Sequence, residues 1–231
     1  MSGRYARTDP LIGEDVRRRL ARTHILIVGV GGVGSWCAEA LVRTGARHLT
    51  LIDDDTVAVS NLNRQAQAIV ATVGRPKVEA LRERLLSIDP EASVAALNER
   101  FAPQSPEGLF GAHIVVDAID SVADKAELIL RATEAGIPIF SSMGAALRRD
   151  PTRIAICRFD KVSGDGLARA LRQRFKRMGR WPAKPFTCVC STESPASMPV
   201  RASLMPVTAA FGLSLAAEVV EAVGLQSFLE Q

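Results

Sequence analysis

A glycine-rich run at residues 29–34, Gly-Val-Gly-Gly-Val-Gly, follows the apolar segment 24–28 and precedes a helix-like stretch. Glycine lacks a Cβ and tolerates positive φ, so such a run can turn a strand tightly into a helix and bring backbone close to a ligand. The helix N-terminus then presents unpaired N–H groups to anionic phosphate. The sequence context therefore favours a nucleotide site over a turn that only packs a helix on a sheet. The predicted nucleotide-binding glycines are Gly29, Gly31, Gly32 and Gly34.

The polar residues that follow the glycine run indicate ATP chemistry rather than nicotinamide chemistry. Asp53 ends the apolar segment 48–52, where a carboxylate can accept hydrogen bonds from ribose hydroxyls, and Asp55 is included in the same predicted site. Arg64 and Lys77 come next, and a dinucleotide-binding dehydrogenase has no use for them. A planar guanidinium and a mobile ammonium together offset the negative charge of a triphosphate.

Asp120 adds a carboxylate at the end of the apolar stretch 113–118. Carboxylate oxygen is a ligand that Mg²⁺ prefers, so Asp120 is the predicted residue for Mg²⁺ bound with ATP. Lys77 begins a predicted helix over 77–88, where a cation opposes the helix dipole, and this favours a functional role for it. The alternatives are ordinary surface cations and, for Asp120, a strand-end cap.

Five motifs in this order resemble the ThiF/MoeB/HesA superfamily, which is similar to the adenylation domain of ubiquitin-activating enzymes. The resemblance runs from about residue 4 to the C-terminus and implies that ATP is cleaved to AMP and pyrophosphate while a carboxylate becomes an acyl-adenylate. The motifs are the glycine run, Leu-Ile-Asp-Asp-Asp at 51–55, Ser-Asn-Leu-Asn-Arg-Gln at 60–65, Val-Gly-Arg-Pro-Lys-Val-Glu at 73–79 and Asp-Ala-Ile-Asp at 117–120.

The resemblance also assigns roles to individual residues. It implies that Arg64, Lys77 and Asp120 carry the adenylation and that Asn61 and Gln65 line the same pocket. The segment Arg-Tyr-Ala-Arg at 4–7 is similar to one in which the second arginine reaches the γ-phosphate of a neighbouring subunit. Arg7 is then a catalytic candidate and the protein a homodimer, whereas a flexible basic tail is the alternative.

The cysteines point to one branch of this superfamily. MoeB-like and ThiF-like members usually carry two Cys-x-x-Cys pairs for structural zinc, but Cys37, Cys157, Cys188 and Cys190 include no such pair, which makes a four-thiolate zinc site improbable. We interpret Cys37 and Cys157 as buried apolar residues. Cys188 begins a Cys-Val-Cys-Ser-Thr-Glu segment, where it acts as a thiol or simply packs.

The segment at 188–193 resembles an element of the tRNA threonylcarbamoyladenosine dehydratase branch, although Cys190 stands where we expect Phe. That branch also has the stretches found here at 31–36, 117–121 and 205–206. The resemblance implies ATP-dependent dehydration of N6-threonylcarbamoyladenosine in tRNA, by adenylation of the threonine carboxylate and ring closure. Cysteine desulfurases or sulfur acceptors are further candidate partners of this branch.

A basic segment supports an RNA substrate. The chain has a net charge of +4 and a pI near 9.1, and residues 166–192 contain seven basic residues and no acid. Apolar residues recur there at helical spacing, so a helix can bury one face and present cations that neutralise RNA phosphates on another. A solvated basic helix is the alternative. The predicted RNA-binding residues are Arg169, Arg172, Lys176, Arg177 and Arg180.

Two rival functions remain at this point. An activator that adenylates the Gly-Gly C-terminus of a ubiquitin-like or sulfur-carrier protein shares the ATP site but usually has the zinc pairs. A non-catalytic nucleotide- and tRNA-binding module would bind both ligands without releasing pyrophosphate. A nicotinamide oxidoreductase is the least favoured, because no residue supplies a base for hydride transfer.

Hydrophobic periodicity predicts one α/β domain over 1–231, with a Rossmann-like, doubly wound and mainly parallel sheet. Residues 160–206, the basic helix and a following loop, form a predicted substrate-facing insertion, and loop 180–206 is predicted to close over substrate. The polar first 20 residues and the 16-residue length of the longest uncharged stretch, 202–217, predict a cytoplasmic protein without a membrane span. Predicted strands are 24–29, 48–53, 93–97, 113–118, 137–141 and 153–159, and predicted helices are 33–44, 77–88, 121–135 and 207–223.

Overall fold

The computed structural model describes residues 3–102, 111–200 and 202–225. In these residues one seven-stranded sheet has the strand order β3-β2-β1-β4-β5-β7-β6. All neighbouring strands are parallel except β6 and β7, which are antiparallel. The strands are β1 His24–Val28, β2 His48–Ile52, β3 Ser93–Leu97, β4 Ile114–Asp117, β5 Ile139–Ser142, β6 Ile154–Arg158 and β7 Thr187–Ser191.

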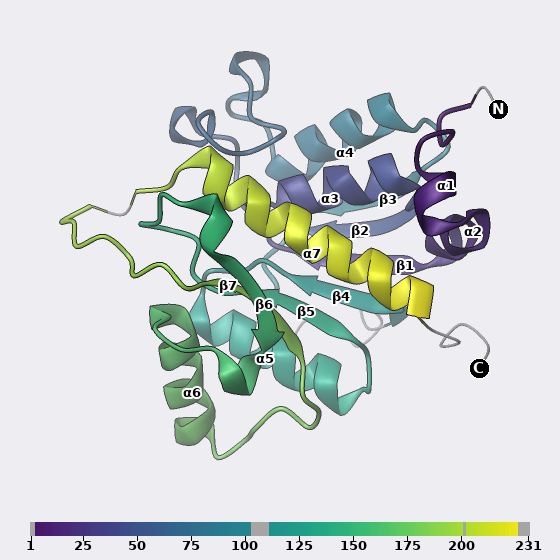
Figure 1. Cartoon of the computed structure of the whole chain (residues 1–231). Helices are drawn as coiled ribbons and strands as arrows, with labels where there is room; N and C mark the ends of the chain where they lie inside the picture. Colours follow the sequence, from purple (N-terminus) through teal and green to yellow (C-terminus); the bar gives the residue numbers. More distant parts are fainter. Residues whose placement is uncertain (1–2, 103–110, 201, 226–231) are drawn as a thin grey trace.

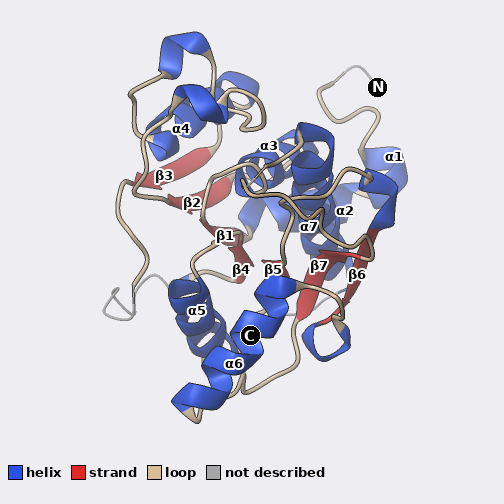
Figure 2. Cartoon of the chain, turned by 90° about the vertical axis from the view of Figure 1, so that its left-hand side faces the viewer, coloured by secondary structure: helices blue, strands red, loops and turns tan. Residues whose placement is uncertain are grey.

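Helices cover both faces of this sheet, so the predicted doubly wound α/β fold is confirmed (Figure 1, Figure 2). α2, α3, α4 and α7 pack in one hydrophobic core, whereas α5 and α6 pack in the core on the other face. The helices are α1 Asp9–Ile12, α2 Glu14–Arg22, α3 Gly34–Thr44, α4 Lys77–Ile88, α5 Val122–Glu134, α6 Gly166–Met178 and α7 Met205–Leu225.

The central strands are apolar on both sides, as parallel strands between two helical layers must be. Ile25 and Ile27 of β1 face the α3 side, and Leu26 and Val28 face the α5 side. β2 and β4 flank β1, and the order of strands along the chain reverses between β1 and β4. In open α/β sheets ligands bind outside the carboxyl ends of the strands at such a reversal. The topology therefore directs attention to the loops after β1 and β4.

The prediction of an irregular loop over 180–206 was wrong for part of that range. Residues 187–191 form β7, which lies between β5 and β6 and is buried along most of its length. The signal was hidden because this five-residue strand is flanked by proline and serine, and because its alternating cysteines are weak strand indicators. The basic helix α6 is thus followed along the chain by a strand of the sheet rather than by one long free loop.

α7 is long and apolar enough, by length and composition, to span a membrane. Nine of its residues are nevertheless buried, and they pack against α3, α2 and the sheet. A helix that is apolar on several sides is also what the middle of a soluble core requires. The packing of α7 is that of a core helix.

Candidate functional site

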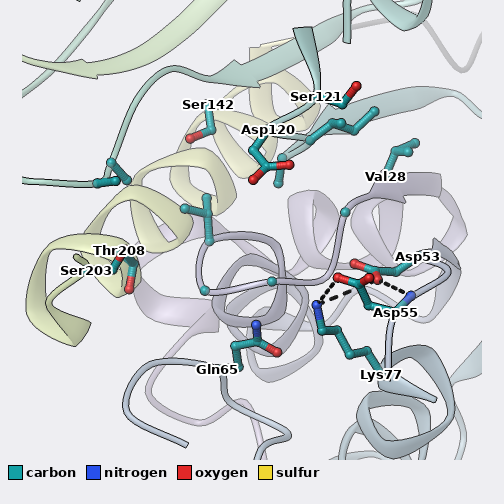
Figure 3. Close-up of a pocket in the computed structure, with 18 of the residues that line it drawn as sticks. Val28, Asp53, Asp55, Gln65, Lys77, Asp120, Ser121, Ser142, Ser203 and Thr208 are labelled. Carbon is teal, nitrogen blue, oxygen red and sulfur yellow. Dashed lines mark hydrogen bonds and ion pairs between the residues drawn. The ribbon is translucent and has the colours of Figure 1, made fainter. Parts of the chain in front are cut away.

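A cavity of about 830 Å³ opens at the carboxyl ends of β1, β2, β4 and β5. It lies at the reversal of strand order, where the loops after β1 and β4 meet. Figure 3 shows the glycine turn crossing the middle of this cavity, with Asp53, Asp55 and Lys77 on one side and Asp120 and Ser142 on the other. The cavity brings together the acids and cations predicted for the nucleotide site and three of the four predicted glycines, because Gly29, Gly31, Gly32, Asp53, Asp55, Asn61, Arg64, Gln65, Lys77 and Asp120 all line it. Gly34, the fourth predicted glycine, is buried at the start of α3 and does not line the cavity.

The turn after β1 requires glycine at two places. Gly29 has φ +88°, and a Cβ on it would lie 2.8 Å from the carbonyl carbon and oxygen of Ala118. A Cβ on Gly34, at the start of α3, would lie only 1.9 Å from the Gly29 carbonyl oxygen. The first turn of α3 therefore sits directly on the loop, and Gly31, Gly32 and Val33, which precede the helix, line the cavity. Phosphate is favoured near a helix N-terminus of this kind.

Asp53 joins this turn to the second strand. Its Oδ2 accepts a 2.8 Å hydrogen bond from the Val30 amide, and its Oδ1 accepts one of 3.0 Å from the Asp55 amide. Burial raises the pKa of the Asp53 carboxyl, although the nearby Lys77 ammonium opposes the shift. A carboxylate held by two amides at a strand end is already oriented for a further hydrogen bond to a ligand hydroxyl.

Lys77 is nearly buried, with 6% of its surface exposed. Its Nζ lies 2.6 Å from Oδ2 of Asp55 and 3.9 Å from Oδ1 of Asp53. These acids hold the ammonium in the cavity, although its helix position opposes the dipole. The oxygens of Asp53, Asp54 and Asp55 also lie within 4.8 Å of one another. Asp53 already accepts hydrogen bonds from two backbone amides, and Asp55 pairs with Lys77. We therefore do not assign a metal site to these three aspartates.

Arg64 lies under the glycine turn, in contact range of Gly32. The Trp36 side chain donates a 2.8 Å hydrogen bond to the Arg64 carbonyl oxygen, which fixes the backbone at this point. The guanidinium donates to the Ser60 carbonyl and to Asn63 Oδ1, both at 2.9 Å. Both acceptors are exposed, so the side chain is held at the cavity rim and can exchange these partners for phosphate oxygens.

Asn61 and Gln65 line the cavity but are largely buried. Asn61 Oδ1 accepts a 3.0 Å hydrogen bond from the Ala58 amide and so shapes the loop that carries Arg64. Gln67, which the sequence reasoning missed, donates to the Val30 carbonyl oxygen at 2.8 Å and lies 3.4 Å from Gln65 Oε1. These amides tie the segment 58–68 to the glycine turn.

A second wall of the cavity follows β5 and was not predicted. Gly144 contributes to it, and both of its peptide groups are held by a buried ion pair. Its amide donates to Asp165 Oδ2 at 3.1 Å, and its carbonyl oxygen accepts from Arg148 Nε at 2.7 Å. Asp165 Oδ1 also caps α6 through the Ala168 amide. The Gly144 wall is thereby coupled to the basic helix α6.

Glu193 holds the loop that follows the Gly144 wall. Its carboxylate accepts hydrogen bonds from the amides of Arg149 and Asp150 at 3.0–3.1 Å, and these bonds lower its pKa. The neighbouring Leu147 has a left-handed backbone, with φ +63°. Glu193, which follows β7, therefore fixes the backbone at 149–150 in the loop that continues the Gly144 wall.

The placement of Cys188 argues against a thiol role. The side chain is fully buried in the core between the sheet and α5–α6, it does not line the cavity, and burial raises its pKa strongly. A reactive cysteine needs an accessible thiolate. Cys37 is likewise buried in the core, as predicted, whereas Cys157 is partly exposed and its Sγ lies 3.7 Å from that of Cys190.

Arg7 lies far from the cavity of its own chain. Tyr5, in the same N-terminal segment as Arg7, is close to Gly45, the residue after α3, and Tyr5 also donates a 3.3 Å hydrogen bond to Asp89. α3 begins at the cavity and has 11 residues, so its other end is about 16 Å away. Arg7 is exposed there and does not line the site.

The basic helix α6 forms as predicted and buries Leu171 and Phe175. Two of the predicted RNA-binding residues, Arg172 of α6 and Arg180 just after the helix, already have protein partners. Arg172 donates to the carbonyl oxygens of Phe159 and Val162, and Arg180 pairs with Glu134 at 2.9 Å. The side chains of Arg169, Lys176 and Arg177 are exposed.

Comparison with known proteins agrees with this geometry. The profile of the ThiF family matches residues 5–227. The chain belongs to the ThiF family. A tRNA threonylcarbamoyladenosine dehydratase of Bacillus subtilis is 36% identical to this ThiF-family chain over 197 residues, which are 84% of this chain and 77% of the relative.

Two crystal structures of the Escherichia coli tRNA N6-threonylcarbamoyladenosine dehydratase TcdA are also similar to this ThiF-family chain. The complex with AMP has a TM-score of 0.90 and the complex with ATP one of 0.89. Each is 37% identical and covers 95% of this chain and 93% of its own. The resemblance drawn from the sequence is therefore confirmed at the level of both sequence and fold.

Proposed function

We propose that this protein is an ATP-dependent dehydratase that closes a ring on N6-threonylcarbamoyladenosine in tRNA. The observation that carries the proposal is the meeting of the glycine turn, Arg64, Lys77 and Asp120 in one cavity. These groups suit the cleavage of ATP between the α- and β-phosphates, and relatives 36–37% identical to this chain are named for the dehydratase reaction.

In the first step the threonine carboxylate of the modified nucleoside attacks the α-phosphorus of ATP, and pyrophosphate leaves. The attack brings an anion to an already crowded triphosphate, so neutralising charge lowers the barrier. Arg64 grips phosphate oxygens with its planar fork, and Lys77 exchanges the Asp55 carboxylate for phosphate. Asp53 accepts from the ribose, and the glycine turn holds the phosphates.

In the second step an atom of the same threonylcarbamoyl group attacks the activated carbonyl and closes the ring. The bond to AMP breaks, so the carboxylate oxygen that attacked phosphorus leaves on AMP and the nucleoside has lost one water in total. No protein nucleophile is needed, and Cys188 is a packing residue in this scheme. The wall around Gly144 provides the side of the cavity that faces the nucleoside.

Mg²⁺ fits the donor chemistry of the site. Asp120 lines the cavity at the end of the β4 turn and offers the carboxylate oxygen that Mg²⁺ prefers, so it would hold the ion. When bound, Mg²⁺ offsets triphosphate charge and orients the leaving pyrophosphate. Asp120 would in this way complement the Lys77 ammonium on the opposite side of the cavity.

The wider assignments rest on the resemblance together with the placement of residues. Arg7, exposed far from the cavity of its own chain, completes the site of a partner subunit in a homodimer. The chain is one adenylation domain over 1–231 in which 160–206 faces the substrate. It is a cytoplasmic protein without a membrane span, and cysteine desulfurases or sulfur acceptors are candidate partners.

The exposed cations of α6 are expected to contact RNA phosphates. Replacing Arg169, Lys176 and Arg177 together by alanine should weaken tRNA binding and reduce the slope of log K against log salt by about 2–3. Filter binding at several salt concentrations measures this slope. The matched control neutralises three exposed arginines on other elements, Arg18, Arg43 and Arg82, and should leave the slope unchanged. Equal slopes for both triple variants would contradict the assignment of α6.

The decisive experiment incubates the protein with ATP, Mg²⁺ and tRNA that carries N6-threonylcarbamoyladenosine, and then weighs the digested nucleosides. The expected result is loss of one water from that nucleoside, matched by release of AMP and pyrophosphate. With ¹⁸O in the threonine carboxylate, the label should appear in AMP, because that oxygen forms the bond to phosphorus. Loss of water with no label in AMP would contradict carboxylate adenylation.

An unchanged nucleoside would contradict the dehydratase and redirect the work to the rivals. ATP-dependent adenylation of a protein ending in Gly-Gly would then favour a carrier-protein activator. Binding of ATP and tRNA without any pyrophosphate release would favour a non-catalytic binding module.

A further inference from the structure

Lys125 of α5 is a lysine whose side chain is completely buried. Its Nζ lies 2.8 Å from Asp117 Oδ2 and donates a 3.1 Å hydrogen bond to the Ile119 carbonyl oxygen. Removing an ammonium from water costs several kcal/mol, so lysine at a core position of a helix is seldom found without specific partners. The partners here belong to one short turn, the residues that follow β4.

The same turn is held from other sides as well. Asp117 is fully buried, its Oδ2 accepts a 2.6 Å hydrogen bond from the Ser141 hydroxyl of β5, and its Oδ1 accepts the Ile119 amide at 3.2 Å. The Ala118 amide donates to the Val28 carbonyl oxygen at the end of β1. Asp117 and Lys125 thus bind the amide and the carbonyl of the same residue, Ile119, which fixes the two peptide planes of the turn.

This turn touches the nucleotide site at two points. Its last residue, Asp120, lines the cavity, and Figure 3 shows the Asp120 carboxylate across the glycine turn from Lys77. Its second residue, Ala118, lies so close to Gly29 that no Cβ fits between them. Lys125 holds the Ile119 carbonyl next to Asp120, whereas Ala118 is tied separately to Val28. A shift of residues 119–120 would therefore move the predicted cation ligand and leave the contact of Ala118 with Gly29 in place.

We propose that Lys125 is a positioning residue, which holds the 117–120 turn so that the Asp120 carboxylate faces the phosphates and their divalent cation. This inference rests on the proposed role of Asp120 in Mg²⁺·ATP binding and adds the group that orients it. An apolar residue in place of Lys125 would remove the Lys125 donor from the Ile119 carbonyl and leave the buried Asp117 carboxylate without its cation, with Oδ2 held by the Ser141 hydroxyl. Lys125 touches neither substrate nor cation and acts only through Asp117 and Ile119.

The test is ATP affinity by isothermal titration, measured with Mg²⁺ and again with excess EDTA. Lys125→Met should weaken binding of Mg²⁺·ATP about tenfold, the scale of one lost hydrogen bond to a charged group, and change metal-free ATP binding less than about twofold. The Ile119 amide should also exchange its hydrogen faster relative to the amides of β1, because its turn is no longer held.

Two further variants separate positioning from loss of stability. Leu20→Ala truncates a fully buried side chain of α2 and lowers the thermal stability of the fold without touching the cavity. Its ratio of ATP affinities with and without Mg²⁺ should equal that of the wild type. If Lys125→Met does not fold, the double variant Lys125→Met with Asp117→Asn removes both buried charges and should still lose the Mg²⁺-dependent part of the affinity.

The proposal is overturned if the folded variants bind Mg²⁺·ATP like the wild type, if both affinities fall equally, or if wild-type affinity does not respond to Mg²⁺. Failure of the proposed function gives a different result. A wild type that binds Mg²⁺·ATP but leaves the tRNA nucleoside unchanged would contradict the dehydratase while the binding comparison still decides the role of Lys125.

Discussion

Replacing Lys77 by methionine is expected to lower kcat/KM for AMP formation on the modified tRNA by about 10²–10³-fold, the usual cost of removing one preorganised group that stabilises transition-state charge. The Lys77 ammonium is nearly buried beside Asp53 and Asp55, and low-dielectric surroundings strengthen its attraction for phosphate. Methionine keeps most of the apolar stem, so packing changes little. Release of AMP and pyrophosphate from modified tRNA measures the effect.

Two comparisons sharpen this result. Arg82→Met removes a cation of α4 whose side chain is 48% exposed, and activity should be retained because Arg82 lies outside both the cavity and the segment 160–206. Asp55→Asn keeps the Lys77 ammonium but removes the charge of its 2.6 Å partner, so the loss should be smaller than for Lys77→Met. Equal activity of Lys77→Met and the wild type would show that Lys77 only balances the two acids.

The parts of the site that lie at strand ends were predictable. β1 and β2 are short, mostly apolar runs that Gly29 and Asp53 follow at once, and the apolar run of β4 ends in Asp117. Parallel strands bring their carboxyl ends to one edge, so residues distant in sequence, such as Asp53 and Asp120, had to approach each other. Arg64 was found through the order of the motifs, and Lys77 through the same order together with its position at the start of the predicted helix 77–88.

The supporting residues were not predictable from pattern. Lys125 lies in a helix where a lysine normally indicates a solvent-facing position. Its burial depends on the contact with Asp117 at the end of β4, which Ser141 of β5 also holds. Arg148 pairs with Asp165, 17 residues away, and the sequence carries no periodic signal for that contact. Such pairs form only when separate elements pack together, so a short stretch of sequence does not reveal them.

β7 shows the same limit in secondary structure. Its buried residues Cys188, Val189 and Cys190 are apolar on both faces, yet Cys188 in a resembled motif suggested chemistry. The structure explains the segment by packing between β5 and β6, and by Glu193, which clamps the loop at 149–150. The segment 188–193 therefore supports one wall of the cavity through Glu193, and it supplies no thiol to the reaction.

Gly29→Ala is expected to weaken ATP binding at least tenfold and to destabilise the fold. The position has φ +88°, which costs an alanine about 1–2 kcal/mol, and the new Cβ would lie 2.8 Å from backbone atoms of Ala118. Neither backbone is a flexible side-chain end, so the glycine turn and the 117–120 turn must move apart. Isothermal titration with ATP and thermal unfolding measure the two effects.

Gly74→Ala is the matched control, because it separates backbone strain from the close contact. Gly74 has almost the same backbone angle, φ +87°, but no atom lies within 4 Å of a Cβ built on it, and it does not line the cavity. It should lose about 1–2 kcal/mol of stability and keep ATP affinity within about twofold. If both variants lose the same stability and both keep ATP affinity, the approach of Gly29 to Ala118 does not set the shape of the phosphate site. If only Gly29→Ala loses ATP, the contact between the two turns is what makes the end of β1 a nucleotide site.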